Sequence, residues 1–180
     1  MLWFFVPYSQ DKKMFEAWDR LMNLVANPND WVCMMDGDVM FLLSDFGHQI
    51  QEYIDRYPDT GLFTCYASRT GNKDQRLEEE MSENPDIVFH RIRAEYCRDH
   101  FKLRVKDIFK AYGHLLCIKK STWTAIRPRV KELTRASNLF DTDTAVSAGV
   151  RKAGMKIRVM ESVYVLHYYR LKDKNRNHLI

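Results

Sequence analysis

Short apolar runs alternate with amphipathic segments from the start of the chain, and this alternation restricts the fold more than any other feature. Residues 2–7, 31–35 and 61–67 are apolar runs typical of buried strands, and 2–7 is predicted to be a central strand closed by Pro7. Between them, residues 12–26 and 44–57 carry apolar side chains at helical spacing. This order predicts one α/β domain, a nucleotide-binding mixed sheet, largely parallel, flanked by helices.

The second half of the chain continues the alternation. We predict a helix from Asp86 to about residue 100, a strand at 113–120, a short helix from Ser121 to about Pro128, a helix at 142–153 ended by Gly154, and two closing strands, KIRVM and SVYVLHYY. Asp11 is the expected N-cap of the first helix.

Two polar segments are predicted to lie outside this regular structure. Residues 68–86 are highly charged and indicate a mobile surface loop, and the basic tail 170–180 lacks periodicity and indicates a flexible end. No composition shift marks a boundary, so residues 1–180 are predicted to form a single domain.

Bulk properties restrict the class of protein. No apolar run is long enough for a signal peptide or a transmembrane segment. The four cysteines form no CxxC pair, which indicates buried, reduced thiols and a cytoplasmic protein. The formal net charge of +4 is compatible with a polyanionic ligand but does not require one.

The strongest local motif is Asp36-Gly37-Asp38, directly after the WVCMM run. In open α/β sheets, ligands bind beyond the carboxyl ends of strands, where two acids are costly unless they meet a cation. In a fully extended chain the two carboxylates would lie about 6.6 Å apart, too far for both to bind one ion. We therefore expect one to bind metal and the other to contact a ribose hydroxyl or a metal-bound water, while a plain turn remains the structural alternative.

Three further features could complete a site. Asp141 and Asp143 precede a helix; N-capping explains one of them, and the pair could include a general base. His167 ends an apolar strand, where a packed histidine is the common alternative to a metal ligand. After Tyr168 and Tyr169, the residues Arg170, Lys172 and Lys174 could close on phosphates as a flap.

In this order, DGD followed by LFDTDTAVSAGVRKAGMKIRVMESVYVLHYYR resembles the A-type-fold glycosyltransferases, close to family two and the polypeptide N-acetylgalactosaminyltransferases, over about residues 2–172. The chain departs from the family pattern in having Thr142-Asp143 for Glu-Asp, Gly149 for an arginine, and no second strand before DGD.

The resemblance implies a metal-dependent transferase that uses a nucleotide-sugar donor, most simply a UDP-sugar, with Mn²⁺ or Mg²⁺. The implied roles are metal binding by Asp38 and His167, a ribose or water-mediated metal contact by Asp36, and proton acceptance by Asp143. Pro7, Tyr8 and Ser9 would hold the nucleotide, and Gly113 and His114 would border the donor sugar and the acceptor.

Two other functions are compatible with parts of the sequence. A nucleotidyltransferase would also use paired acids and metal, although PYSQDKK lacks the glycines of a phosphate loop. A non-enzymatic nucleic-acid-binding module would explain the basic 89–106 region but not DGD. The acceptor is not readable from the sequence; a saccharide, a protein hydroxyl and a modified nucleic-acid base all remain open.

Overall fold

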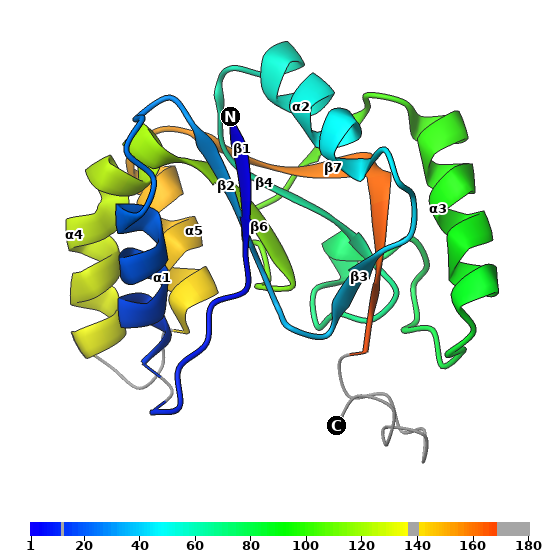
Figure 1. Cartoon of the computed structure of the whole chain (residues 1–180), viewed down its shortest axis with the longest axis horizontal. Coiled ribbons are helices and arrows are strands. Elements are labelled where there is room, and N and C mark those ends of the chain that lie inside the picture. The colour runs from blue at the N-terminus through cyan, green and yellow to red at the C-terminus, as the bar shows by residue number, and fades with distance from the viewer. Residues whose placement is uncertain (12, 137–140, 169–180) are drawn as a thin grey trace.

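The computed structural model describes residues 1–11, 13–136 and 141–168 of the 180-residue chain. These residues form a mixed seven-stranded sheet flanked by helices, the α/β arrangement that the sequence predicts (Figure 1). The strands are β1 (Leu2–Phe5), β2 (Trp31–Met35), β3 (Val39–Phe41), β4 (Thr60–Ala67), β5 (Val105–Asp107), β6 (Leu115–Lys119) and β7 (Lys156–His167). The helices are α1 (Met14–Asn23), α2 (Phe46–Arg56), α3 (Ile87–Phe101), α4 (Lys120–Ala136) and α5 (Thr142–Lys152), with a 3-10 turn η1 (Lys73–Gln75).

The strand order corrects two predictions. Strands follow the order β1-β2-β6-β4-β7-β3, and β5 also pairs with β7. In the described sheet β1–β2 and β4–β7 are the parallel pairs, so the prediction of a largely parallel sheet is wrong: β6 runs antiparallel between β2 and β4, and β3 and β5 run antiparallel to β7. The first apolar run is an edge strand rather than a central one.

Side chains of the central strands alternate between the two faces of the sheet. Val32 and Met34 pack with α1, α4 and α5 on one face, whereas Cys33 packs with α2 on the other. Helix α3 packs against β7 at the far end of the sheet (Figure 1). All four cysteines are buried and form no disulfide, as predicted.

One strand replaces the two closing strands that the sequence suggests. β7 runs from Lys156 to His167, but its register against β4 shifts between the pairs Cys65–Met160 and Tyr66–Tyr164. The three residues at 161–163 form this irregularity. The charged and polar side chains that break the apolar pattern are accommodated by the bulge, so the strand continues.

Helix α4 does not stop near Pro128, which corrects another prediction. The proline removes one backbone N–H, but its would-be acceptor, the carbonyl of Thr124, belongs to an exposed residue that water can reach. Buried Ile126 and Val130 hold the helix on both sides of the proline. Arg127 adds a bidentate ion pair to Asp19 of α1.

Of the two aspartates predicted to be N-caps, one caps its helix and the other does not. The Asp86 carboxylate accepts a hydrogen bond from the N–H of Val88, which confirms it as the N-cap of α3. Asp11 does not cap α1; instead the N–H of Lys13 donates to Ser9 Oγ at 2.8 Å.

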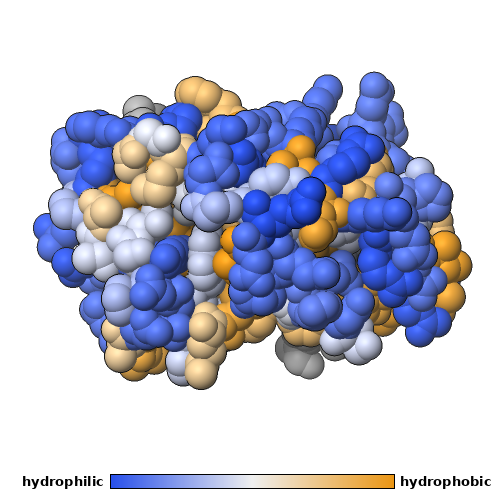
Figure 2. Space-filling view, turned by 90° about the horizontal axis from the view of Figure 1, so that it is seen from above, coloured by the Kyte–Doolittle hydropathy of each residue, from blue (hydrophilic) through white to orange (hydrophobic). Residues whose placement is uncertain are grey.

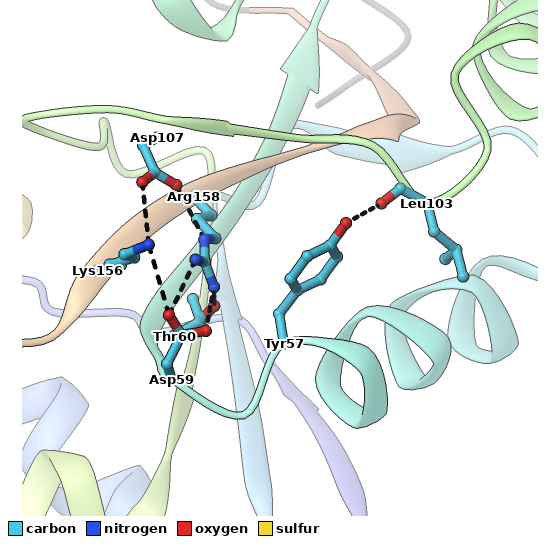
Figure 3. Close-up of polar contacts among 7 residues, drawn as sticks. All are labelled: Tyr57, Asp59, Thr60, Leu103, Asp107, Lys156 and Arg158. Carbon is cyan, nitrogen blue, oxygen red and sulfur yellow. Dashed lines mark hydrogen bonds and ion pairs between the residues drawn. The ribbon is translucent and has the colours of Figure 1, made fainter.

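At the end of β7 opposite His167, a charged network fixes the strand to its neighbours (Figure 3). Arg158 donates to Asp59, to Thr60 Oγ1 at 2.7 Å and to Asp107 Oδ1 at 2.9 Å, although the arginine itself is buried. Lys156 Nζ lies 3.6 Å from a carboxylate oxygen of Asp59 and from one of Asp107.

Figure 2, which views the molecule from above, shows a mainly hydrophilic surface.

The segment 68–86 is not simply a surface loop. Ser68, Arg69, Thr70 and Gln75 are buried, and the N–H of Ser82 donates to the carbonyl of Ser68 at 2.9 Å. Its mobility stays a prediction. In the described part of the chain, no helix is long and apolar enough to cross a bilayer.

Candidate metal centre and adjoining cleft

Three potential metal ligands meet beyond the ends of β2 and β7. Asp36 and Asp38 come from the turn between β2 and β3, and His167 is the last residue of β7. One ligand atom from each lies within 4.8 Å of the other two. His167 Nε2 is 3.3 Å from Asp38 Oδ1 and 3.6 Å from Asp36 Oδ2.

The two carboxylates converge because the chain turns between them. The N–H of Val39 donates to the carbonyl of Asp36 at 3.3 Å, so residues 36–38 are not extended. The 6.6 Å separation expected of a strand therefore does not apply, and both carboxylates can contribute to the same ion. The N–H of Tyr168 donates to the carbonyl of Asp38 at 3.2 Å and holds this turn beside the end of β7.

His167 is held in a ligand-like orientation by the segment that follows β4. Its Nδ1 lies 2.7 Å from the carbonyl oxygen of Arg69, which can only accept, so Nδ1 carries the proton. The Ser68 hydroxyl accepts from the backbone N–H of His167 and donates to its carbonyl. In the neutral ring, the lone pair of Nε2 therefore faces Asp36 and Asp38, the tautomer that metal-binding histidines use.

The group opens into a cleft of about 640 Å³. Asp36 and His167 line one side of it, and Asp141 and Asp143 at the start of α5 line another. A Cβ placed on Gly113 would lie 3.7 Å from Asp143 Oδ2, so the carboxylate rests against the glycine with ordinary contact distances. The cleft is within the size range of small-molecule sites.

The electrostatics of the cleft favour a cation. The pKa of Asp36 is raised above its ordinary value, mainly by desolvation. The charge of His167 opposes this rise, and the charges of Asp38 and Asp143 add to it. Desolvation likewise raises the pKa of Asp143 despite the bond that its carboxylate accepts from Thr144 N–H. Protein around the cleft thus excludes part of the bulk water from these acids, and a divalent cation would relieve their mutual repulsion.

His114 contributes a neutral ring behind the metal centre. Burial, reinforced by neighbouring His167, lowers its pKa to about 3. Its Nε2 donates to the carbonyl of Cys65 at 3.0 Å, and among the described residues Nδ1 has no hydrogen-bond partner. A neutral imidazole at this position does not repel a bound cation.

The other predicted site residues have diverse positions. Asp141 is exposed on the rim, and its side chain makes no capping bond to α5. Pro7 lines the cleft, whereas Tyr8 projects into solvent and the Ser9 hydroxyl accepts a hydrogen bond from the N–H of Lys13, just before α1. Tyr169, Arg170, Lys172 and Lys174 lie outside the described residues.

Sequence reasoning missed Ser68 and Arg69, which orient His167, and Lys110 and Tyr112, which line the cleft. A usable signal existed for the first two, because they follow the carboxyl end of β4 as Asp36 follows that of β2. Lys110 and Tyr112 lie in a loop, and no pattern in the sequence indicates which loop faces the cleft.

No protein-family model matches this chain, and no curated protein matches it either. Two carboxylates and one imidazole form an oxygen-rich donor set that suits Mn²⁺ and, less closely, Mg²⁺. The oriented tautomer of His167 satisfies the further requirement that a ligating histidine be fixed through its second nitrogen.

Proposed function

We propose that this protein is a metal-dependent glycosyltransferase that moves a sugar from a nucleotide-diphosphate sugar, most simply a UDP-sugar, to an acceptor hydroxyl. The observation that carries the proposal is the convergence of Asp36, Asp38 and His167 on a cleft whose other side holds the half-buried Asp143. The resemblance of the ordered motifs to A-type-fold glycosyltransferases agrees with this arrangement.

The metal site would serve the leaving group. Asp36, Asp38 and His167 would hold Mn²⁺ or Mg²⁺. When bound, the ion would neutralise the charge that develops on the departing nucleoside diphosphate. Arg69 and Ser68 keep His167 in place for this role through the bonds described above.

Asp143 would act on the acceptor. The acceptor oxygen forms a bond to the anomeric carbon while the bond from that carbon to the diphosphate oxygen breaks, and the electron pair leaves with the nucleoside diphosphate. The proton of the attacking hydroxyl passes to the Asp143 carboxylate. This single displacement predicts inversion at the anomeric carbon, so an α-linked donor gives a β-linked product.

A donor screen tests the proposal. The protein is incubated with the common nucleotide sugars and Mn²⁺, with and without chelator, and the release of nucleoside diphosphate and of sugar is measured. We expect release with at least one donor, its loss on chelation and in Asp38→Asn, and its retention in Asp55→Asn, an exposed carboxylate on α2 bonded to Gln51.

The products separate the alternatives. A nucleotidyltransferase would release pyrophosphate from a nucleoside triphosphate and a sugar phosphate, and a nucleic-acid-binding module would release nothing. Pyrophosphate release with every nucleotide sugar left intact would refute glycosyl transfer in favour of nucleotidyl transfer. Intact nucleotide sugars with no metal-dependent nucleotide binding would refute both enzymatic functions.

A further inference from the structure

A rigid wall of the cleft stands beside Asp143 and has no part in the mechanism above. It is formed by residues 110–112, whose backbone is held by the segment around η1. Asn72 Nδ2 donates to the carbonyl of Lys110 at 2.7 Å, and the N–H of Tyr112 donates to Gln75 Oε1, also at 2.7 Å. Gln75 is completely buried, so these bonds connect the wall to the core.

The Tyr112 ring determines where the Lys110 ammonium lies. Lys110 Nζ is 4.5 Å from the centroid of that ring, a cation–π contact. The ring is itself packed onto Gly71, where an added Cβ would be 2.6 Å from Tyr112 Cε2. The wall therefore presents a positioned cation to the cleft.

Within the residues that the structure describes, the charge of this cation is not balanced by a contacting carboxylate. Among the described residues, no acid lies within ion-pair distance of Lys110, although it is close enough to Asp143 for its charge to oppose the rise in that carboxyl's pKa. Arg135, near the end of α4, lines the same cleft and also lacks an acidic partner in the described part of the chain. Lys110 is half-buried at the cleft wall and has no ion-pair partner among these residues, which favours an anionic ligand.

We infer that the acceptor carries an anionic group, a phosphate monoester or a carboxylate, next to the hydroxyl that receives the sugar, and that Lys110 binds this group. The inference rests on the proposed function. It assigns the anion to the acceptor because Lys110 stands beside Asp143, whereas the donor diphosphate would lie at Asp36, Asp38 and His167.

Matched acceptors test the inference. Each neutral sugar is compared with its phosphate monoester and with its uronic acid, using the donor found in the screen, in wild type, Lys110→Gln, Lys110→Arg and the control Lys131→Gln, a lysine of α4 that does not line the cleft. We expect wild type to prefer one anionic form, and Lys110→Gln to lower kcat/KM for that form about 10- to 100-fold more than it lowers kcat/KM for the neutral sugar, because any effect on Asp143 is common to both acceptors. Lys110→Arg should restore part of the loss, and the two anionic forms identify which charge is recognised.

Two results would overturn the inference while leaving the proposed function intact. In one, wild type uses neutral and anionic acceptors equally well. In the other, Lys110→Gln weakens Mn²⁺-dependent binding of the nucleoside diphosphate by the factor expected for the acceptor, which would assign the cation to the donor.

If no donor is turned over, binding still decides the point. Inorganic phosphate is titrated into the protein and followed by NMR of the backbone amides of residues 110–113. Perturbation of these amides in wild type that is lost in Lys110→Gln would support an anion site, and equal binding in both would refute it. Failure of the proposed function would appear separately, as absence of metal-dependent nucleotide binding.

Discussion

The pKa of Asp143 links its position to a measurable pH dependence. Burial raises this pKa above the ordinary value of 3.8, and only the ionised carboxylate can accept a proton. Activity should therefore be present above the raised pKa and fall as the pH decreases through it, so the acidic limb of kcat/KM should lie above the range of an exposed aspartate. Asp143→Asn should keep nucleotide affinity and lose about 10²–10⁴-fold in turnover. Near-normal turnover, or a product that retains the donor's configuration, would contradict the role as base.

His167 permits a second test at the same scale, because metal binding and packing predict different losses. If His167 is a metal ligand, His167→Ala should weaken Mn²⁺-supported turnover about 10–100-fold and raise the Mn²⁺ concentration needed for half-maximal rate. If His167 serves only in packing, the same substitution should lower the melting temperature without changing the metal requirement. Both quantities are measured on this variant and on Ser68→Ala, which loses the hydroxyl that bonds the His167 backbone and keeps the imidazole.

Site residues could be predicted from the sequence where the signal is local. Asp36, Asp38 and His167 each follow or end an apolar run, and that position alone brings them to the edge of a sheet. Their convergence required the turn at 36–38, which the assumption of an extended strand excluded. The position of Arg69 after β4 places it at this edge, but its contact with His167 Nδ1 is made by a backbone carbonyl, a group that every residue has, so the sequence does not reveal that contact.

Helices α4 and α5 pack closely where one carries a glycine, and this contact explains why Gly149 replaces the arginine expected from the resemblance. A Cβ at Gly149 would lie 3.1 Å from Ile126 Cβ, an atom fixed to its own backbone. In Gly149→Ala, overpacking should cost about 1–3 kcal/mol, more than the roughly 1 kcal/mol that helix propensity returns. The free energy of unfolding, measured with urea, should therefore fall.

Gly47 of α2 is the matched control for this prediction. It is also a helical glycine, but nothing lies within 4 Å of an added Cβ. Gly47→Ala should raise the free energy of unfolding by about 0.5–1 kcal/mol. If both variants are stabilised, the interface at Gly149 is looser than the distances indicate.

The bounds of a helix or the place of a strand could be predicted where residues within that element determine them. They could not be predicted where packing against other elements determines them. Helix α3 begins at Asp86 because the carboxylate caps it, a local effect. Helix α4 passes Pro128 because Ile126, Val130 and the Arg127–Asp19 pair stabilise the turns around it, all of which depend on packing against other elements. Likewise, the edge position of β1 depends on where β6 inserts in the sheet.

The candidate metal centre joins two segments that are distant in the sequence and paired in the sheet, so metal binding should stabilise the fold as well as the site. Asp36 and Asp38 precede β3, whereas His167 ends β7, and an ion held by all three closes this edge of the sheet. An ion present at 100 times its dissociation constant adds about 2.7 kcal/mol to the free energy of unfolding. Mn²⁺ should raise the melting temperature of wild type and of Asp55→Asn, whose exposed carboxylate lies on α2 away from the three ligands.

Asp36→Asn should separate two effects of this carboxylate on stability: the repulsion that its charge causes without metal, and the stabilisation that it gives as a metal ligand. Desolvation by the surrounding protein raises the pKa of Asp36 in the folded state, although its side chain is 48% exposed. Its ionised form therefore opposes folding above that pKa, to an extent that solvent screening reduces, and the opposition disappears as the pH falls below the unfolded value. At neutral pH without metal, the asparagine removes that charge, so the variant should melt at or above the temperature of metal-free wild type. With Mn²⁺ the order should reverse, because the variant has lost a ligand and gains little from the ion. A variant that melts below wild type without metal and still gains the full Mn²⁺ shift would show that Asp36 stabilises the turn and does not bind the ion.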